Sequence, residues 1–523
     1  MTGRRGRRAS RDVWGIRHVP LVTPEEAATL DAAAHDRHHV PGRVLMESAG
    51  RAAALVLDRL FPRGRVVVAA GSGNNGGDAL VLARVLSAWG RDVRVVAAGS
   101  KPPDPALRHG FDIRVADFDD DPTLFTSADV LVDGVLGTGA HGAPREPAAT
   151  VIEAMNGVDR PILALDLPSG VDAARGDVDG LAVRAAVTVT FGWPKIGLLF
   201  QPARSRCGRL IAVEIGFPPL HVSNEDAALL LTPDWAAERL PRRPPAAHKG
   251  TSGRLLLVAG TDGMAGAAVI AARAAQRAGA GLVEVASSAA NRVVLQTAVP
   301  EAIFSDRAEL HEREESGAHA LVAGPGIGLN VDAVHTIEAA LELTPGVRTA
   351  FDADALNMFA RAPDRLTEIG QSRDFVITPH PAELSRLTGR SVTEIVADPV
   401  TAAREAASRF GCSVLLKGQP SIIASPGQPL LVSSVGSSDV ASAGMGDQLA
   451  GVIGAMLAAG LSAREAAAVA LFYSGRAADL ADRGRSLGPA EVSDTLHTAF
   501  EQPGARRNPT GLPFVLFDQP ARW

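Results

Sequence analysis

The stretch Val66-Val-Val-Ala-Ala-Gly-Ser-Gly-Asn-Asn-Gly-Gly-Asp-Ala-Leu-Val-Leu-Ala-Arg84 joins an apolar strand to an apolar helix through a glycine-rich loop. This order is typical of parallel α/β sheets, where ligands bind at the carboxyl ends of the strands. Glycines let backbone N–H groups approach an anion, and a helix N-terminus adds positive potential. A tight turn would explain the glycines alone, but it would not need the polar side chains of Asn74, Asn75 and Asp78. We therefore expect a binding site at this loop.

The alternation of strand, turn and helix recurs along two long segments of the chain. Strands are expected in the first segment at Arg65–Ala70, Val93–Ala98, Asp129–Val132, Pro161–Leu165, Val187–Phe191 and Leu210–Ile215. Strands are expected in the second segment at Arg254–Ala259, Leu282–Ala286, Ala320–Ala323, Val347–Phe351, Phe375–Ile377 and Ser413–Leu416. Ala-rich helical stretches lie between or after them, so each segment predicts a parallel sheet flanked by helices.

Three further stretches lack this alternation. The run Leu240-Pro-Arg-Arg-Pro-Pro-Ala-Ala-His248 breaks both helix and strand, so we expect a linker over 223–246. Residues 1–18 are rich in Arg and no apolar stretch follows them, which indicates a disordered tail rather than a secretory signal. An organelle transit peptide is the alternative. Residues 502–523 are rich in Pro, Arg and Gly, and we expect a second tail there.

The amino-acid composition argues against several classes of protein function. The chain has 523 residues, 46% of them hydrophobic and 21% charged, with a formal net charge of −6. These values are typical of a soluble globular protein, and the acidic balance disfavours binding to nucleic acid or to anionic membranes. No uncharged apolar run reaches the roughly 20 residues that span a bilayer. Only two cysteines occur, which excludes a disulfide framework and makes the cytoplasm the expected compartment.

Other strand ends in the first segment carry oxygen-bearing side chains. Leu131-Val-Asp133 leads into a glycine-containing turn, and Leu163-Ala-Leu-Asp166 leads into Leu167-Pro-Ser-Gly170. These side chains should converge with Asn75 at the carboxyl edge of the sheet. Oxygen ligands with few charges suit a hard cation. Each Asp taken singly is better explained as a helix cap, but the set together with the glycine loop favours a site.

These motifs, together with Leu45-Met-Glu-Ser-Ala-Gly50, resemble the N-terminal epimerase domain of the NAD(P)H-hydrate repair enzymes. That domain interconverts the R and S epimers of hydrated NADH or NADPH at C6 of the nicotinamide ring. The resemblance implies a potassium ion held by Asn75, Asp133 and Ser169. It implies hydrate contacts at Asn74, Asn75, Gly76, Gly77, Asp78, Gly137, Thr138, Gly139, Ala140, His141, Gly142, Ala143 and Asp166. Epimerisation needs an acid/base group, and Asp166 is our candidate because it ends a strand just before Pro168.

The second segment has the features of phosphoryl transfer. Ser442-Ala-Gly-Met-Gly-Asp-Gln448 precedes an apolar helix, whose N-terminus would stabilise a phosphoryl group while Asp447 accepts the proton of an attacking hydroxyl. A helix-capping Asp would explain this motif alone. Val414-Leu-Leu-Lys-Gly418 adds a strand ending in a lysine suited to a nucleotide phosphate. No Walker A sequence is present, so the motif is not that of a P-loop enzyme.

The order of motifs resembles the C-terminal dehydratase domain of the same repair enzymes, which has a ribokinase-like fold. The motifs are His248-Lys-Gly250, Gly324–Gly328, Asp352–Asn357, Thr378–Glu383, Lys417-Gly418 and Gly444–Asp447. That family removes water from the S hydrate by using ADP or ATP to phosphorylate the C6 hydroxyl. The resemblance makes Asp447 the catalytic base and a hydrate contact, with further hydrate contacts at Ala267, Gly326 and His380. It implies adenine-nucleotide contacts at Lys417, Gly418, Gln419, Pro420, Ser421 and Gly446, with Mg²⁺ neutralising the phosphates.

The sequence therefore predicts an α/β protein that has two activities. A Rossmann-like αβα epimerase domain is expected over 19–222, and a ribokinase-like dehydratase domain over 247–501. The partners are small molecules, namely the hydrates and ADP or ATP, and assembly as a homo-oligomer is expected. Two alternatives remain: a ribokinase-like small-alcohol kinase, and a non-catalytic nucleotide-binding or scaffold role for the first domain. Spontaneous hydration would give both epimers, so a dehydratase acting on one epimer needs an epimerase.

The use of lysine marks the same sites. The chain has 48 Arg but only four Lys, at positions 101, 195, 249 and 417. Lys417, Lys249 and Lys195 all lie in motif segments, whereas Lys101 lies in a Pro-rich loop. A compact ammonium and a planar guanidinium are not interchangeable, so these three are the positions where Arg should fail.

Overall fold

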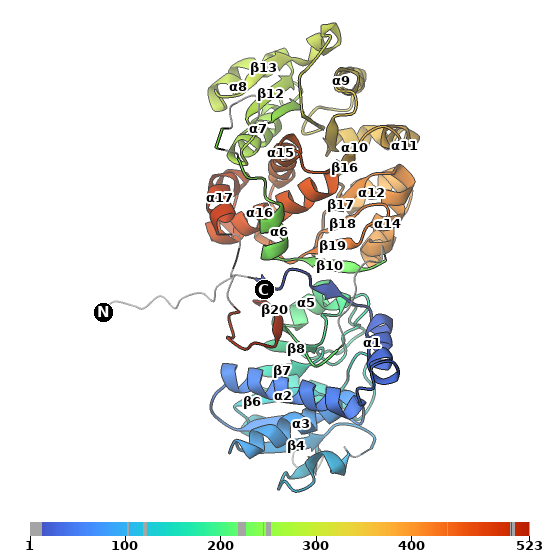
Figure 1. Cartoon of the computed structure of the whole chain (residues 1–523), viewed down its shortest axis with the longest axis vertical. Coiled ribbons are helices and arrows are strands. Elements are labelled where there is room, and N and C mark those ends of the chain that lie inside the picture. The colour runs from blue at the N-terminus through green and yellow to red at the C-terminus, as the bar shows by residue number, and fades with distance from the viewer. Residues whose placement is uncertain are drawn as a thin grey trace, which may run out of the picture. The chain divides into compact units, whose positions relative to one another are not determined.

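The computed structural model describes residues 13–101, 104–118, 123–217, 226–243, 245–246, 253–436, 438–502, 504 and 508–521. The chain divides into two compact units, Met1–Ser223 with Ala505–Trp523, and Asn224–Gly504 (Figure 1). Within the described residues, none of the helices is long and apolar enough to cross a membrane.

The first unit is built on a sheet with the strand order β1-β20-β9-β8-β7-β6-β3-β4-β5. Its strands are β1 (Trp14–Gly15), β3 (Val66–Ala70), β4 (Val93–Ala97), β5 (Val115–Asp117), β6 (Val130–Gly134), β7 (Ile162–Leu165), β8 (Val187–Phe191), β9 (Arg209–Val213) and β20 (Val515–Gln519). Its helices are α1 (Pro24–Asp36), α2 (Gly42–Leu60), α3 (Asn74–Ala88), α4 (Ala148–Asn156) and α5 (Ala203–Arg206), and the short strand β2 (Pro20–Leu21) precedes α1. The strands from β3 to β9 pair in parallel.

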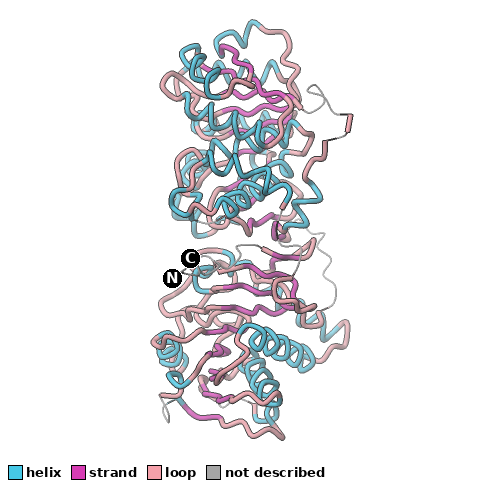
Figure 2. The backbone as a smooth tube through the Cα atoms, turned by 90° about the vertical axis from the view of Figure 1, so that its left-hand side faces the viewer, coloured by secondary structure: helices cyan, strands magenta, loops and turns pink. Residues whose placement is uncertain are grey.

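Both faces of this sheet are covered, which makes the unit an αβα three-layer structure, as the sequence predicts (Figure 2). Alternate residues of a strand point to opposite faces. Val66 and Val68 of β3 accordingly pack with α2 and α3, whereas Val67 and Ala69 pack with α4. A strand that is buried on both sides must be apolar throughout, which is why β3 reads as an unbroken apolar run.

The expectation of tails at both ends of the chain is wrong for the described residues. Val515–Gln519 forms β20, which pairs antiparallel with β9 and with β1. Asp518 is buried and receives two hydrogen bonds from Arg209, at 2.8 and 2.7 Å. The end of the chain is therefore an inner strand of the first unit, and this ion pair holds it there. Residues 1–12 lie outside the described residues.

The second unit is built on a sheet whose strands follow the order β13-β12-β11-β14-β15-β16-β17-β18-β19-β10. They are β10 (Ala228–Leu231), β11 (Arg254–Val258), β12 (Leu282–Ser287), β13 (Ile303–Asp306), β14 (Ala320–Ala323), β15 (Arg348–Phe351), β16 (Phe375–Ile377), β17 (Ser413–Leu416), β18 (Ile422–Ala424) and β19 (Leu430–Ser433). The helices are α6 (Pro233–Arg239), α7 (Ala265–Arg277), α8 (Arg292–Ala298), α9 (Val331–Leu343), α10 (Asp354–Phe359), α11 (Asp364–Gly370), α12 (Pro381–Thr388), α13 (Val392–Ala397), α14 (Pro399–Phe410), α15 (Met445–Ala458), α16 (Ala463–Ala481) and α17 (Pro489–Glu501). Helices α7, α15, α16 and α17 share one large core with the sheet.

The expected linker over 223–246 is also corrected by the structure. Residues 228–231 form β10, which pairs in parallel with β19, and α6 begins directly after them. The side chain of Thr232 caps α6, and Trp235 is buried in the core of the second unit. The proline-rich run lies after these elements, so the prolines end α6 and do not begin the domain. Residues 244 and 247–252, including the predicted motif His248–Gly250, lie outside the described residues.

We expect Asp518→Ala to destabilise the first unit and leave the second unit unchanged. The substitution removes a buried carboxylate from a two-bond ion pair, which costs on the order of 3 kcal/mol. Hydrogen exchange followed by mass spectrometry should report faster exchange in β8 and β9, while peptides of α15 and α16 serve as an internal control. Arg175→Ala, which breaks an exposed pair with Asp177, is the matched variant and should cost less than about 1 kcal/mol. Unchanged protection of β9 in the Asp518 variant would contradict this account.

Candidate active sites

The first site lies where β3, β6 and β7 end side by side. These strands are neighbours in the sheet, and their registers pair Ala70 with Gly134 and Asp133 with Ala164. The loops that follow them therefore start at the same edge. Helix α3 begins at this edge directly after the glycine loop, with Gly73 as its N-cap residue.

Two glycines of the loop are required by close backbone contacts. A Cβ atom on Gly71 would lie 2.0 Å from the carbonyl oxygen of Val135, and one on Gly76 would lie 1.9 Å from the carbonyl oxygen of Gly71. No side chain fits at such distances. Gly71 is therefore packed backbone to backbone against both the loop after β6 and the first turn of α3, as expected for a loop that brings N–H groups to a ligand.

The structure brings the predicted potassium ligands Asn75, Asp133 and Ser169 to one place. Ser169 donates hydrogen bonds to both carboxylate oxygens of Asp133, from Oγ at 2.6 Å and from its backbone N at 2.8 Å. Asn75 donates from Nδ2 to the carbonyl oxygens of Leu136 and Leu165. Its Oδ1 atom is buried and has no hydrogen-bond partner among the described residues. Burial raises the pKa of Asp133 to about 6 despite the hydrogen bonds from Ser169.

Asp166 follows β7 and forms a buried ion pair with Lys195. The Lys195 ammonium lies 2.5 Å from Asp166 Oδ1, and it also donates to the carbonyl oxygen of Phe191 and to Thr190 Oγ1. The backbone of Lys195 is fixed by a bridge to Val22. Asp166 has a φ of 63°, which is uncommon for a residue other than Gly. The backbone of Asp166 is therefore held in an uncommon conformation, and its carboxylate is held by Lys195.

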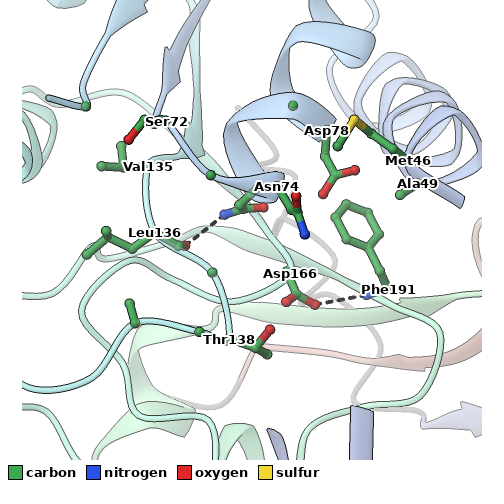
Figure 3. A pocket seen from close by; sticks show the side chains of 18 of the residues that line it. Met46, Ala49, Ser72, Asn74, Asp78, Val135, Leu136, Thr138, Asp166 and Phe191 are labelled. Atoms are coloured by element: carbon green, nitrogen blue, oxygen red, sulfur yellow. Dashed lines mark hydrogen bonds between the residues drawn. The ribbon is translucent and has the colours of Figure 1, made fainter. Parts of the chain in front are cut away.

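A cavity of about 1270 Å³ opens at this edge (Figure 3). That volume exceeds the range of roughly 300–1,000 Å³ usual for drug-sized ligands. Of the hydrate contacts implied by the resemblance, the lining includes Asn74, Asn75, Gly77, Asp78, Gly137–Ala143 and Asp166. Gly76, Asp133 and Ser169 support this wall without lining it. Asp31, Met46, Phe191 and Trp193 also line the cavity, although the sequence assigned none of them a role in the site. Lys195 was singled out by its position in a motif segment and by the scarcity of lysine.

The second site lies where β15, β16 and β17 end and α15 begins. Asp352 follows β15 and is buried, and it accepts hydrogen bonds from Thr378 Oγ1 at 2.7 Å and from Lys417 Nζ at 2.8 Å. A Cβ atom on Gly446 would lie 3.5 Å from Asp352 Oδ2 and 3.7 Å from Lys417 Nζ. The predicted nucleotide residues Gly446 and Lys417 are therefore close together, although they are far apart in the sequence.

Asp447 lies in the first turn of α15, after the left-handed N-cap residue Gly444. Burial raises the pKa of Asp447 to about 6, and the nearby negative charge of Asp352 adds to this effect. The positive charge of Lys417 lowers the pKa of Asp447. A carboxylate with such a pKa is ionised at neutral pH and still accepts a proton readily, which suits a general base.

Lys417 is held by carboxylates in this structure. Burial lowers its pKa, but Asp352 and Glu383 outweigh that effect and raise it above its ordinary value. Glu383 Oε2 lies 3.9 Å from the ammonium. Beyond Lys417, the loop that contains Gln419 and Pro420 is closed by the side chain of Ser421, which accepts from Gly418 N and donates to Gly418 O.

The remaining predicted hydrate contacts lie at two neighbouring places. A Cβ atom on Gly326 would lie 2.9 Å from the Cβ atom of Ala267, so the loop after β14 lies against the start of α7. His380 is the N-cap residue of α12, and its Nδ1 accepts from the backbone N atoms of Ala382 and Glu383. This capping role orients the ring whether or not it also contacts a ligand.

Both halves of the chain match models of known families. Residues 42–197 match the YjeF-related protein N-terminus, and residues 255–498 match NAD(P)H-hydrate dehydratase. The bifunctional NAD(P)H-hydrate repair enzyme Nnr of Moorella thermoacetica is 34% identical over 507 residues, covering 91% of this chain and 95% of that protein. The chain belongs to the bifunctional NAD(P)H-hydrate repair enzymes. The Nnr of Escherichia coli is 36% identical and covers 83% of this chain and 84% of its own length.

Membership of this repair family confirms the fold class and the enzyme class predicted from the sequence. It also favours the bifunctional repair function over the small-alcohol kinase. Among solved structures, the ADP/ATP-dependent NAD(P)H-hydrate dehydratase from Bacillus subtilis is 27% identical, with a TM-score of 0.47, and covers 52% of this chain and 97% of that chain.

The close packing of the glycine loop gives a paired prediction for this repair enzyme. Gly76→Ala forces a Cβ atom against the Gly71 carbonyl and should destabilise the first unit by about 1–3 kcal/mol. Gly73→Ala, three residues earlier, meets nothing within 4 Å and should be nearly neutral. Denaturant unfolding followed by protease resistance of the first unit compares the two variants. Equal stability of both variants would show that the loop is not closed by this contact.

Proposed function

We propose that the two sites divide the repair of hydrated NADH and NADPH between them. The first unit interconverts the R and S epimers at C6, and the second unit dehydrates the S epimer at the expense of ADP or ATP. The observation that carries this proposal is the presence of both sites in one chain, with Asp166 beside Lys195 in one unit and Asp447 beside Lys417 in the other. The restoration of both epimers needs the two activities together.

In the first unit we assign the acid/base role to Asp166. The hydrate would lie in the large cavity, against residues 74–78 of the glycine loop and residues 137–143 of the loop after β6. Lys195 balances the charge of Asp166 and holds its carboxylate toward the cavity. Epimerisation requires the C6 hydroxyl to leave and return, or the ring to open and close, and either route moves a proton that Asp166 can take or give.

In the second unit we assign the base role to Asp447. It accepts the proton of the C6 hydroxyl as that oxygen attacks the terminal phosphoryl group of the nucleotide. Loss of phosphate from C6 and of a proton from C5 then restores the ring double bond. Residues 417–421 and Gly446 would hold the nucleotide at the N-terminus of α15, where the helix dipole favours negative charge. Ala267, Gly326 and His380 would contact the hydrate.

The side chains present fit the two cations that the resemblance implies. Asn75 Oδ1 is a buried acceptor without a partner among the described residues, and Asp133 and Ser169 supply further oxygen atoms beside it, as a potassium ion requires. A potassium ion there would join the start of α3 to the end of β6 and to the loop after β7. In the second unit, the described residues contain no group of three or more His, Cys, Asp or Glu side chains that could hold a metal ion. Asp447 and the nearby Asp352 would supply one or two carboxylate ligands to Mg²⁺ beside those from the nucleotide phosphates, which is the usual way that Mg²⁺ binds in such sites. Mg²⁺ would neutralise charge on the phosphates.

The cellular setting and the partners remain predictions. Cys207 and Cys412 are both free and buried, which is consistent with the cytoplasm that we propose as the compartment. Assembly as a homo-oligomer and the absence of nucleic-acid partners also remain predictions.

Single substitutions should separate the two activities. Asp447→Asn should abolish the recovery of reduced-nicotinamide absorbance from S hydrate with ADP or ATP, yet still equilibrate the two epimers. Asp166→Asn should dehydrate S hydrate normally and lose epimerisation by about 100-fold or more. Chromatography of the epimers and absorbance measure the two activities in one sample. Wild-type recovery by the Asp447 variant, or wild-type epimerisation by the Asp166 variant, would overturn the corresponding assignment.

The pH dependence of dehydration should report Asp447. The base must be ionised, so the rate should fall about tenfold per pH unit below the pKa near 6. An unperturbed Asp, with a pKa of 3.8, would place this fall about two units lower. The measurement is the dehydration rate at saturating S hydrate and ATP across this range. A rate independent of pH down to 5 would contradict the assigned pKa.

A further inference from the structure

The cavity of the first unit contains a second buried carboxyl group that the proposed mechanism does not use. Asp78 lies on the first part of α3 and is 9% exposed, and Asp166 at the end of β7 is 8% exposed. Both line the cavity. Figure 3 shows the two carboxyl groups pointing into it from different elements, with the ring of Phe191 beside the space between them.

The two carboxyl groups differ in their partners. Asp166 has the Lys195 ammonium at 2.5 Å. Asp78 accepts no hydrogen bond and forms no ion pair among the described residues, and it does not cap α3, whose N-cap residue is Gly73. A structural role as a cap or as half of a salt bridge therefore does not explain Asp78.

The charges around Asp78 favour its protonated form. Burial raises its pKa well above the ordinary value, and the negative charges of Asp166 and Asp31 raise it further. Lys195 is the one cation that acts on it in the opposite direction among the described residues, and that ammonium is bound to Asp166. A carboxyl group whose pKa is raised and a carboxylate that is paired with an ammonium thus face the same space, which is the arrangement found where an acid and a base act together.

We propose that Asp78 is a second catalytic residue of the epimerase, which protonates the C6 oxygen on one face of the hydrated ring while Asp166 serves the opposite face. The proposal rests on the epimerase function proposed above. It adds to that function one proton donor and one proton acceptor for a reaction that inverts the configuration at C6.

The proposed epimerisation needs no reactant other than water. Asp78 gives its proton to the C6 hydroxyl, the C6–O bond breaks with its electron pair on the departing water, and the N1 lone pair forms a C6–N1 double bond. A water molecule then adds to C6 from the other face, and its proton passes to the Asp166 carboxylate. One proton has moved from Asp78 to Asp166. The reverse reaction returns it, or exchange with solvent restores both groups.

The test compares the full-length wild type with Asp78→Asn, which keeps the size of the side chain and removes the acid. Epimerisation of purified R hydrate should fall about 100-fold or more. Dehydration of S hydrate with ATP should stay at the wild-type rate and shows that the chain is folded. In the wild type, epimerisation should decline as the pH rises through the raised pKa of Asp78, and the residual activity of the variant should lack this decline.

Asp31→Asn probes the charge on Asp78, since Asp31 on α1 lines the same cavity and carries one of the charges that act on Asp78. Epimerisation by this variant should decline at lower pH than in the wild type because a like charge has been removed. In isotopically labelled water, the wild type should incorporate solvent oxygen at C6 as fast as it epimerises.

Three outcomes overturn the role of Asp78. A wild-type rate and pH profile in the Asp78 variant would remove the acid assignment and leave the epimerase function standing. Retention of the original oxygen during epimerisation would exclude departure and return of water. Failure of the wild type to interconvert the epimers, with Asp166→Asn indistinguishable from it, would remove the epimerase function and the role of Asp78 together.

Discussion

Each unit of the chain holds one lysine ammonium against an aspartate that directly follows a parallel strand. Lys195 pairs with Asp166 after β7, and Lys417 pairs with Asp352 after β15. Removing a charged group from water is expensive unless an opposite charge and hydrogen bonds replace the water. A lysine can therefore be buried to this degree only beside a carboxylate. In both units the aspartate that provides this carboxylate lies at the C-terminal end of a parallel strand. Both candidate sites lie at these strand ends.

This constraint also explains two of the four lysines, Lys195 and Lys417, in a chain that otherwise uses arginine. A compact ammonium fits beside one carboxylate oxygen and a backbone carbonyl, as Lys195 does with Asp166 and Phe191. A guanidinium spreads its charge over a larger plane and needs more acceptors. The structure thus gives Lys195 a role that the sequence marks only by position. Lys249, which the same argument singles out, lies outside the described residues.

The sequence predicts the inner strands well, because a strand buried on both faces leaves a continuous apolar run. All twelve predicted strands are present with small shifts at their ends. The edge strands β5 and β13 escape prediction because they are short and only partly apolar. The inner strand β18 escapes prediction because it has three residues and follows a turn. β20 escapes for a different reason: its partner β9 lies about 300 residues away, and no local pattern encodes pairing at that distance. The prolines and arginines beside it resemble those of a tail.

The residues of the candidate sites also divide into those that the sequence predicts and those that it does not. The motif residues Asn75, Asp133 and Ser169 converge as predicted, since their positions follow from strand order and register. The walls of the cavity supplied by α1 and by the turn after β8 could not be predicted, because Asp31 and Trp193 are placed by tertiary packing alone.

Strand β20 follows the second unit in the sequence but belongs to the first unit. The two units are therefore linked in one covalent chain, and we expect this one chain to repair both epimers. An equilibrium mixture of R and S hydrates, incubated with the wild type and excess ATP or ADP, tests it most directly. Recovery of all the reduced-nicotinamide absorbance, faster than spontaneous epimerisation allows, is the predicted result. Recovery that stops at the fraction present as the S epimer would contradict it.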